Sequence, residues 1–129
     1  MEPELTLAPD LAPLLDELRT LENLFHAAHP DASPADFDRL VPAGFWETGA
    51  TGRRYSRAFA RQVLAGRHGQ PDPATWQTDQ HHLQSAGPGV YLLTYRLHQP
   101  GRVTRRLTVW RREGTQWLAL YHQGTVVSV

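Results

Sequence analysis

The first part of the chain places apolar residues at helical spacing. Leucines and a phenylalanine recur every three or four residues from Leu11 to Phe25, which predicts one amphipathic helix with Asp10 as its N-cap. The segment Ser33–Asp36 combines a capping serine, a proline at the first helical position and an acid two residues later. We therefore expect a short second helix, which Pro42 stops.

The middle of the chain predicts one strand and one further helix. Phe45–Glu47 is too short for anything but a strand, and the glycines of Gly49–Gly52 indicate a turn. A third helix is expected from about Tyr55 to Leu64, with Gly66 at its end. The stretch Gly66–Pro73 is rich in glycine, proline and polar residues, which is typical of a connecting loop.

From Trp76 onward the period changes from helical to alternating, and β-branched and aromatic residues predominate. The turn dipeptides Pro100-Gly101 and Glu113-Gly114 predict hairpins, so neighbouring strands are antiparallel. The four expected strands are Thr75–Leu83, Val90–His98, Val103–Arg112 and Gln116–Val127. This order of elements predicts an α+β fold in a single domain over residues 1–129, with residues 1–9 as a flexible N-terminal tail.

Composition narrows the class of protein. There is no cysteine, which excludes disulfides, thiol nucleophiles and cysteine metal sites and suits a reducing compartment. Lys+Arg and Asp+Glu both number 13, so no net charge attracts nucleic acid or anionic lipid. The first residues lack the pattern of a signal peptide, and no window is apolar enough to span a membrane. We expect a cytoplasmic protein; because every basic residue other than histidine is arginine, we also expect a GC-rich bacterial ancestry.

Three segments carry a resemblance to a known family. These are Leu21-Glu22 in the first helix, Phe45–Gly49, and the region from Thr108 through Trp117 to Thr125. Together they resemble the SnoaL-like families of the nuclear transport factor 2-like superfamily and, more distantly, the association domain of calcium/calmodulin-dependent kinases. The resemblance implies a cystatin-like fold, a cone-shaped α+β barrel in which a curved antiparallel sheet wraps around the N-terminal helices to enclose a pocket. It implies no one function, because this fold hosts isomerases, cyclases, dehydratases and binding modules.

Two-residue turns at both hairpins would fix which side chains share a face of the sheet. Tyr95 then lies opposite Arg106, Arg106 opposite Tyr121, and Trp110 opposite Trp117. This mixed aromatic and polar face is typical of a ligand pocket, so we expect it to be concave; the resemblance also implies pocket residues near Thr108 and Gln123. The ligand-binding candidates are Trp46, Glu47, Tyr95, Arg106, Thr108, Trp110, Tyr121, His122 and Gln123.

Two of these candidates have chemical consequences. A buried Arg106 needs a partner, which is either Glu47 or an anionic ligand. His122 is either a proton-transfer group or a hydrogen-bonded structural histidine. His81 and His82 point to opposite sides of a strand, and no metal-binding spacing of histidines occurs, so we expect neither a metal site nor a cofactor.

The sequence is compatible with three functions. The first is a small-molecule-binding domain, favoured by the mixed face and the missing catalytic signature. The second is an isomerase or cyclase with Glu47, Asp79 or His122 as general base. The third is an oligomerisation module. We also expect a homodimer, because the helices can cover only one of two apolar sheet faces; the second face carries Leu92, Thr94, Leu107, Val109, Leu118, Leu120 and His122.

Overall fold

The computed structural model describes residues 1–26, 32–69 and 76–128. Its helical elements are a 3-10 turn η1 (Pro9–Leu11), α1 (Ala12–Leu21), a second 3-10 turn η2 (Glu22–Leu24), α2 (Pro34–Leu40) and α3 (Arg57–Arg67). Its strands are β1 (Trp46–Thr48), β2 (Arg54–Ser56), β3 (Gln77–Gly87), β4 (Val90–Gln99), β5 (Arg102–Glu113) and β6 (Gln116–Val126).

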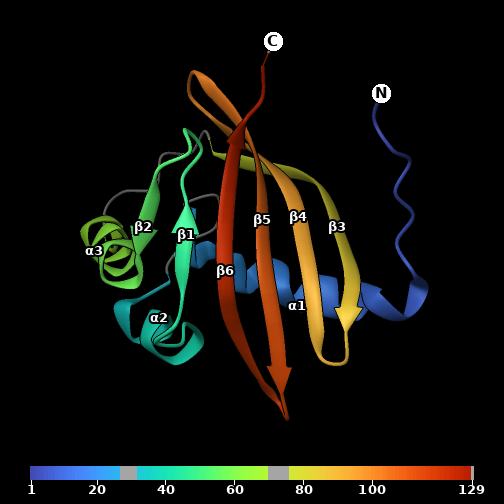
Figure 1. Ribbon diagram of the computed structural model, residues 1–129, viewed down its shortest axis with the longest axis horizontal. Helices are drawn as coiled ribbons and strands as arrows, with labels where there is room; N and C mark the ends of the chain where they lie inside the picture. Colours follow the sequence, from blue (N-terminus) through green and yellow to red (C-terminus); the bar gives the residue numbers. More distant parts are fainter. Residues whose placement is uncertain (27–31, 70–75, 129) are drawn as a thin grey trace.

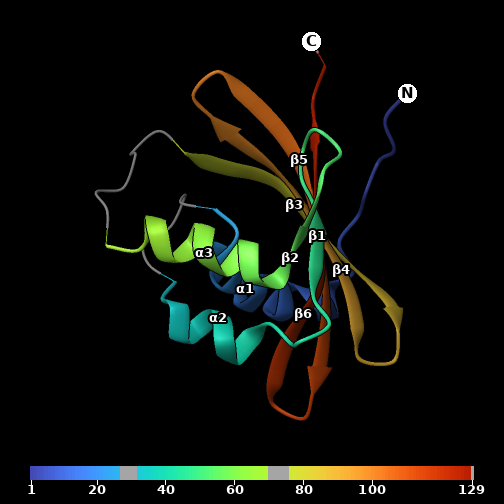
Figure 2. The same cartoon turned by 60° about the vertical axis from the view of Figure 1, so that its left-hand side comes forward.

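The strands form one curved, open sheet in the order β2-β1-β6-β5-β4-β3. All neighbours are antiparallel except β1 and β6, which run parallel. The helices α1, α2 and α3 lie on one side of this sheet, which is its concave side (Figures 1 and 2). The predicted α+β fold, a curved antiparallel sheet around N-terminal helices, is therefore confirmed.

The first helix begins later than the sequence predicted. Asp10 lies inside η1 and does not cap α1, because the turn that begins at Pro9 already gives Asp10 a helical backbone, whereas an N-cap needs an extended one. Leu15 and Leu18 of α1 are buried in the core. After α1 the backbone continues as the 3-10 turn η2, in which Glu22 and Leu24 are buried.

The second helix follows its prediction closely. The Ser33 hydroxyl accepts a hydrogen bond of 3.1 Å from the backbone N–H of Asp36, and the Asp36 carboxylate accepts one of 2.9 Å from the backbone N–H of Ser33. This reciprocal pair is a capping box. It orients α2 so that Phe37 and Leu40 enter the core.

Between the second and third helices the sequence prediction missed a strand. The turn at Gly49–Gly52 closes a short β1–β2 hairpin, so Tyr55 lies in β2 opposite Glu47 instead of starting a helix. Helix α3 starts at Arg57 because the Ser56 hydroxyl caps it, and it continues through Gly66 to Arg67. The loop predicted for Gly66–Pro73 lies partly outside the described residues.

The two C-terminal hairpins differ in how well they were predicted. Across Pro100-Gly101, Tyr95 pairs with Arg106 as expected. The predicted register of the β5–β6 hairpin is wrong, because Glu113 pairs with Gln116 and the turn residues are Gly114 and Thr115. Gly114 has a φ of +60°, a conformation that glycine adopts at the first turn position more easily than glutamate.

A β-bulge in β6 adds a second change of register. Trp110 pairs with Ala119, but Val109 pairs with Tyr121, so Leu120 is an extra residue. Beyond the bulge the two faces of β6 are exchanged relative to the prediction. His122 therefore lies opposite Thr108 on the concave face, whereas Tyr121 and Gln123 lie on the convex face.

The concave face of the sheet forms the core with the helices. Trp110, Leu93 and Leu97 are fully buried there, against Leu18 of α1 and Phe37 of α2. On the convex face the leucines and valine predicted to form an apolar surface are half-buried. None of the described helices is long and apolar enough to cross a membrane.

Candidate functional site

A buried carboxylate organises the interior of the concave side. Glu22 is only 1% exposed, because η2 turns it into the core. The Tyr95 hydroxyl donates to it at 2.7 Å and the Trp110 indole N–H at 2.9 Å. Thr108 also hydrogen-bonds it, but burial outweighs these bonds and raises the pKa of Glu22 to about 7.

A chain of hydrogen bonds leads from Glu22 to a cavity. The Thr108 hydroxyl is 2.7 Å from Nδ1 of His122, and Nε2 of His122 is 3.4 Å from Nη1 of Arg106. A hydroxyl has one proton, so when Thr108 donates to Glu22 it accepts from Nδ1 of His122. Nε2 is then unprotonated and faces the Arg106 guanidinium, which is always a donor. Every donor in this chain of hydrogen bonds therefore points towards Glu22.

His122 is held as a neutral, hydrogen-bonded ring. It is 2% exposed, and the Phe25 ring stacks on it at 4.2 Å between centroids. Burial, the charge of Arg106 and the nearby His26 lower the pKa of His122 well below its usual 6.5. Both ring nitrogens are occupied by protein partners. The geometry therefore fits a structural histidine better than a general base.

Arg106 forms the cavity end of this chain. Its Nε donates to the Thr104 hydroxyl at 2.9 Å. Gly124 leaves the room for it, because a Cβ at Gly124 would lie 3.3 Å from Nε and 3.4 Å from Cζ of Arg106. Burial lowers the pKa of Arg106. Among the described residues its guanidinium forms no ion pair, and its remaining N–H groups have no protein acceptor.

We call the space beside Arg106 the site cavity. It has a volume of about 300 Å³, and Glu47, Arg106 and His122 all line it. Burial raises the pKa of Glu47, and the charge of Arg106 opposes that rise. Its apolar wall comes from the helical side, the β1–β2 hairpin and the residue before β3: Leu24, Phe25, Tyr55, Phe59, Val63 and Trp76.

Two more guanidinium groups border the site cavity. Nη2 of Arg67 is committed to the backbone carbonyls of Asn23 and Leu24, at 2.8 and 3.2 Å. Arg102 is exposed and donates to the Gln99 side chain at 3.2 Å. Among the described residues, Arg67 (through Nε and Nη1) and Arg106 both keep N–H groups without a protein acceptor, and Arg106 is the one that the hydrogen bonds to Thr104 and His122 hold in place.

The structure brings together only some of the predicted site residues. Tyr95, Thr108 and Trp110 lie behind the site cavity in the Glu22 network. The prediction that Tyr121 and Gln123 share the face of Arg106 is wrong, because the bulge turns both away. Trp46, which is 45% exposed, packs edge-on against Tyr121 on that convex side, where the Tyr121 hydroxyl contacts Thr48 and Gln123.

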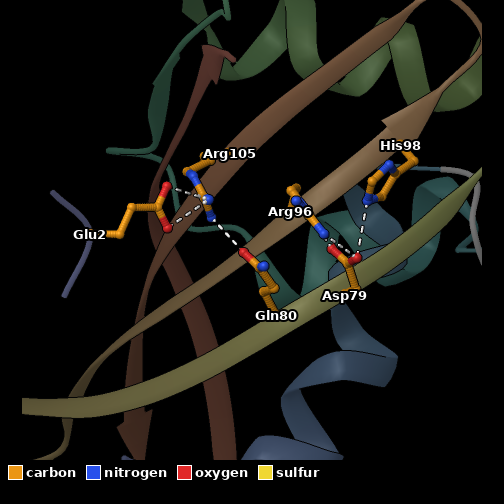
Figure 3. Close-up of polar contacts among 6 residues, drawn as sticks. All are labelled: Glu2, Asp79, Gln80, Arg96, His98 and Arg105. Carbon is orange, nitrogen blue, oxygen red and sulfur yellow. Dashed lines mark hydrogen bonds and ion pairs between the residues drawn. The ribbon is translucent and has the colours of Figure 1, made fainter. Parts of the chain in front are cut away.

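Asp79 was a candidate base, and its surroundings do not suit that role. It accepts hydrogen bonds of 2.8 and 2.6 Å from Arg96 and one of 3.1 Å from His98 (Figure 3). The Arg96 guanidinium lowers the pKa of Asp79 to about 2. Asp79 also does not line the site cavity. It is a partly exposed ion-pair residue between β3 and β4.

A second, larger hollow lies between the N-terminal segment and the sheet. It measures about 720 Å³ and includes Leu5, Leu7 and Leu107 in its lining. The segment lies away from α3, on the other side of the sheet (Figure 2). Among the charged residues that line the hollow, Arg105 donates to Glu2 at 3.1 Å and to Gln80 at 3.0 Å (Figure 3), whereas Arg106 lines this hollow as well as the site cavity. A ligand there would find the Arg105–Glu2 pair already made, so we take the smaller site cavity, where Arg106 is accompanied by Glu47, as the candidate site.

Sequence reasoning missed Glu22 and Gly124 as residues that shape the site. A signal for Glu22 was present, because it occupies the apolar stripe of the first helix four residues after Leu18 and three before Phe25. A charge in such a stripe must find buried partners. Nothing in the sequence marks Gly124, since its role depends on the bulge. Within the described ranges no group of three or more acidic or histidine side chains is placed to hold a metal ion.

Comparison with known proteins gives the fold and no activity. No protein-family model matches the sequence, and neither does any curated protein. Among solved structures, an NTF2-like protein of unknown function in nutrient uptake from Rhodospirillum rubrum matches with a TM-score of 0.65 and 15% identity over 92% of this chain and 99% of that one. An uncharacterised cystatin-like protein from Caulobacter vibrioides matches with a TM-score of 0.65 and 13% identity over 88% and 89%.

A third similar structure is an NTF2-like protein of unknown function from Pseudomonas aeruginosa, with a TM-score of 0.62 and 17% identity over 88% of this chain and 97% of that one. These matches span nearly the whole of each chain, and their low identities carry no information about residues of the site. They agree with the resemblance read from the sequence. The chain has the nuclear transport factor 2-like, cystatin-like α+β fold.

Proposed function

We propose that the protein binds a small organic acid in the site cavity, with the carboxylate of the ligand on Arg106. One observation carries this proposal: a half-buried guanidinium lines the cavity without an ion-pair partner among the described residues. Burying a cation is costly unless a charge or several hydrogen bonds compensate it. A carboxylate matches the planar fork of arginine donors and would supply both.

The size and walls of the site cavity support the same ligand class. Its volume of about 300 Å³ is at the low end of the range for small-molecule sites. Phe25, Tyr55 and Trp76 supply aromatic surface for the non-polar part of a ligand. A compact acid with a short aliphatic or aromatic body fits these walls.

The test compares two neighbouring arginines that lie on opposite faces of β5. Wild type, Arg106→Met and Arg105→Met are titrated calorimetrically with 4-methylpentanoate and with benzoate. Methionine keeps a similar apolar volume, so the fold of Arg106→Met is expected to persist. Wild type and Arg105→Met should bind at least one acid, and Arg106→Met should lose that binding. Equal affinity in wild type and Arg106→Met would refute the proposal.

A second candidate function is proton abstraction next to a carbonyl group, with Glu47 as the base. The observation that favours it is a half-buried carboxylate with a raised pKa beside a guanidinium. Glu47 would take the proton, the electron pair would move to the carbonyl oxygen, and Arg106 would stabilise the resulting negative charge. Proton NMR in D₂O would detect exchange of that proton in 2-oxo acids. Glu47→Gln should abolish an exchange that wild type shows; absence of exchange in wild type would exclude this function for these acids.

We also propose a homodimer, in keeping with the apolar convex face. Leu92, Leu107 and Leu118 are half-buried there, while the helices cover the opposite face. A second copy would bury the remaining apolar surface. Light scattering should give twice the mass of one chain at micromolar concentration, and a monomer throughout would contradict this proposal.

A further inference from the structure

Of the charged side chains that line the site cavity, two of opposite sign form no ion pair with each other. Glu47 on β1 and Arg106 on β5 both line it. Burial raises the pKa of Glu47 and lowers the pKa of Arg106, and the attraction between the two charges opposes both shifts. Among the described residues, however, no ion pair includes either side chain, and no hydrogen bond of the Glu47 carboxylate to protein is present.

The strands place the two residues at different levels of the sheet. Glu47 is level with His122 on the parallel neighbour β6, whereas Arg106 is level with Gly124, two residues further along β6. Arg106 is fixed in place by its bond to Thr104, by its contact with His122 and by the backbone of Gly124 beneath it. A shift of the guanidinium away from this position would disturb these contacts.

A ligand with one charge would satisfy only half of this arrangement. A simple carboxylate on Arg106 would bring a second anion towards Glu47, which would then have to take up a proton. A simple amine beside Glu47 would add a cation near Arg106 and leave the guanidinium unpaired. A ligand with both charges compensates both side chains at once.

We infer that the ligand is a zwitterion of amino-acid size, with its carboxylate on Arg106, its ammonium group on Glu47 and its side chain against the aromatic wall of the site cavity. This inference rests on the proposed function, because it assigns the same carboxylate contact and adds a second one. Glu47 is then the residue that selects an amino acid over the corresponding plain acid.

The experiment uses matched pairs of probes that differ only in the ammonium group. Leucine is compared with 4-methylpentanoate, phenylalanine with 3-phenylpropanoate and alanine with propanoate, and 3-methylbutylamine supplies the ammonium without the carboxylate. Each is titrated calorimetrically into wild type, Glu47→Gln and Glu113→Gln at neutral pH. Glu113 is an exposed carboxylate at the β5–β6 turn and serves as the control.

Wild type and Glu113→Gln should bind at least one amino acid about tenfold or more tightly than its plain acid, which corresponds to one charge-assisted hydrogen bond. Glu47→Gln should remove that preference, chiefly by weakening the amino acid. If every plain acid binds wild type as tightly as its amino acid, the zwitterion inference fails while the proposed function stands. If neither member of any pair binds, both fail; if the amine alone binds, the carboxylate contact is wrong.

Discussion

Glu22 and Glu47 are both carboxylates on the concave side of the sheet, and burial raises the pKa of each. Their surroundings are otherwise opposite. Glu22 lies in the core and receives hydrogen bonds from Tyr95, Thr108 and Trp110. Glu47 lies at the site cavity and receives none from the described residues. One acid is surrounded by donors, and the other faces open space.

This difference separates a structural charge from one available to a ligand. A buried polar group that is fully hydrogen-bonded contributes to the stability of one particular fold, and removing it leaves its partners unsatisfied. A charged group without partners contributes little to stability, and its purpose must be sought in what it can bind. The same contrast applies along β5, where Thr108 is committed to the network and Arg106 keeps free donors.

The largest expected effect comes from removing the structural acid. Glu22→Ala leaves buried donors on Tyr95, Thr108 and Trp110 without their acceptor, so we expect it to lower the free energy of unfolding by about 4 kcal/mol. Glu47→Ala should change it by less than about 1 kcal/mol. Urea denaturation of both variants measures this difference. If both variants lost a similar free energy of unfolding, the distinction between a structural Glu22 and a ligand-facing Glu47 would be wrong.

The raised pKa of Glu22 also predicts a pH dependence. Its pKa is about 7 in the folded protein, against an ordinary value of 4.5. The folded state therefore holds a proton that the unfolded state releases, and stability falls as the pH rises through this window. Relative to Glu22→Gln, which does not titrate, wild type should lose about 2 kcal/mol between about pH 5 and about pH 7.5.

The lowered pKa of His122 makes stability depend on pH in the opposite sense. The contribution of Glu22 must therefore be measured as the difference in stability between wild type and Glu22→Gln at each pH. The folded state resists protonation of His122, and stability is lost as the pH falls below 6.5. Both proteins contain His122, so this contribution largely cancels between them. Parallel pH profiles for wild type and Glu22→Gln would show that Glu22 is ionised throughout.

A smaller effect is expected from Gly124→Ala, which keeps the charge of Arg106 but changes the space available to its guanidinium. In Gly124→Ala the added methyl group would press on the guanidinium of Arg106, with atoms 3.3 to 3.4 Å away. We expect binding of 4-methylpentanoate to weaken about tenfold, with a change in stability of at most about 1 kcal/mol. Gly66→Ala in α3, where a Cβ meets nothing within 4 Å, is the control and should bind normally. Unchanged affinity in Gly124→Ala would mean that Arg106 is not fixed as described.

The smallest effect is expected from a substitution at the start of α2. Ser33→Ala removes the hydroxyl of the α2 capping box and should lower the free energy of unfolding by about 1 kcal/mol. Ligand binding should be unaffected, because α2 contributes no lining to the site cavity. The midpoint of chemical denaturation reports the change, and an unchanged midpoint would show that this cap contributes nothing.

Local signals in the sequence were enough to predict much of the fold. The capping box at Ser33 and the turn at Pro100-Gly101 each depend on a few neighbouring residues, and both were predicted correctly. The turn at Pro100-Gly101 also predicted that Tyr95 and Arg106 share a face, because one hairpin register fixes which residues of β4 and β5 lie together.

The errors arose where distant parts of the chain decide the outcome. Leu120 has no local mark of a bulge, yet it reverses the faces of β6 and brings His122 to the site in place of Tyr121 and Gln123. The short strand β2 is stable only because β1 pairs with it and with β6. The role of Glu22 depends on donors contributed by β4 and β5, which helical periodicity cannot reveal.

The central property proposed for the site cavity is that its Arg106 end binds a carboxylate. An NMR titration of ¹⁵N-labelled protein with 4-methylpentanoate tests this directly, with Arg106→Met used to assign the side-chain Nε–H signal of Arg106. We predict that this signal and the ring nitrogens of His122 shift together in wild type. Arg106→Met should show no matching shift at His122. Shifts confined to Arg105 and Gln80 on the convex face, or identical shifts in wild type and Arg106→Met, would show that Arg106 does not bind the carboxylate.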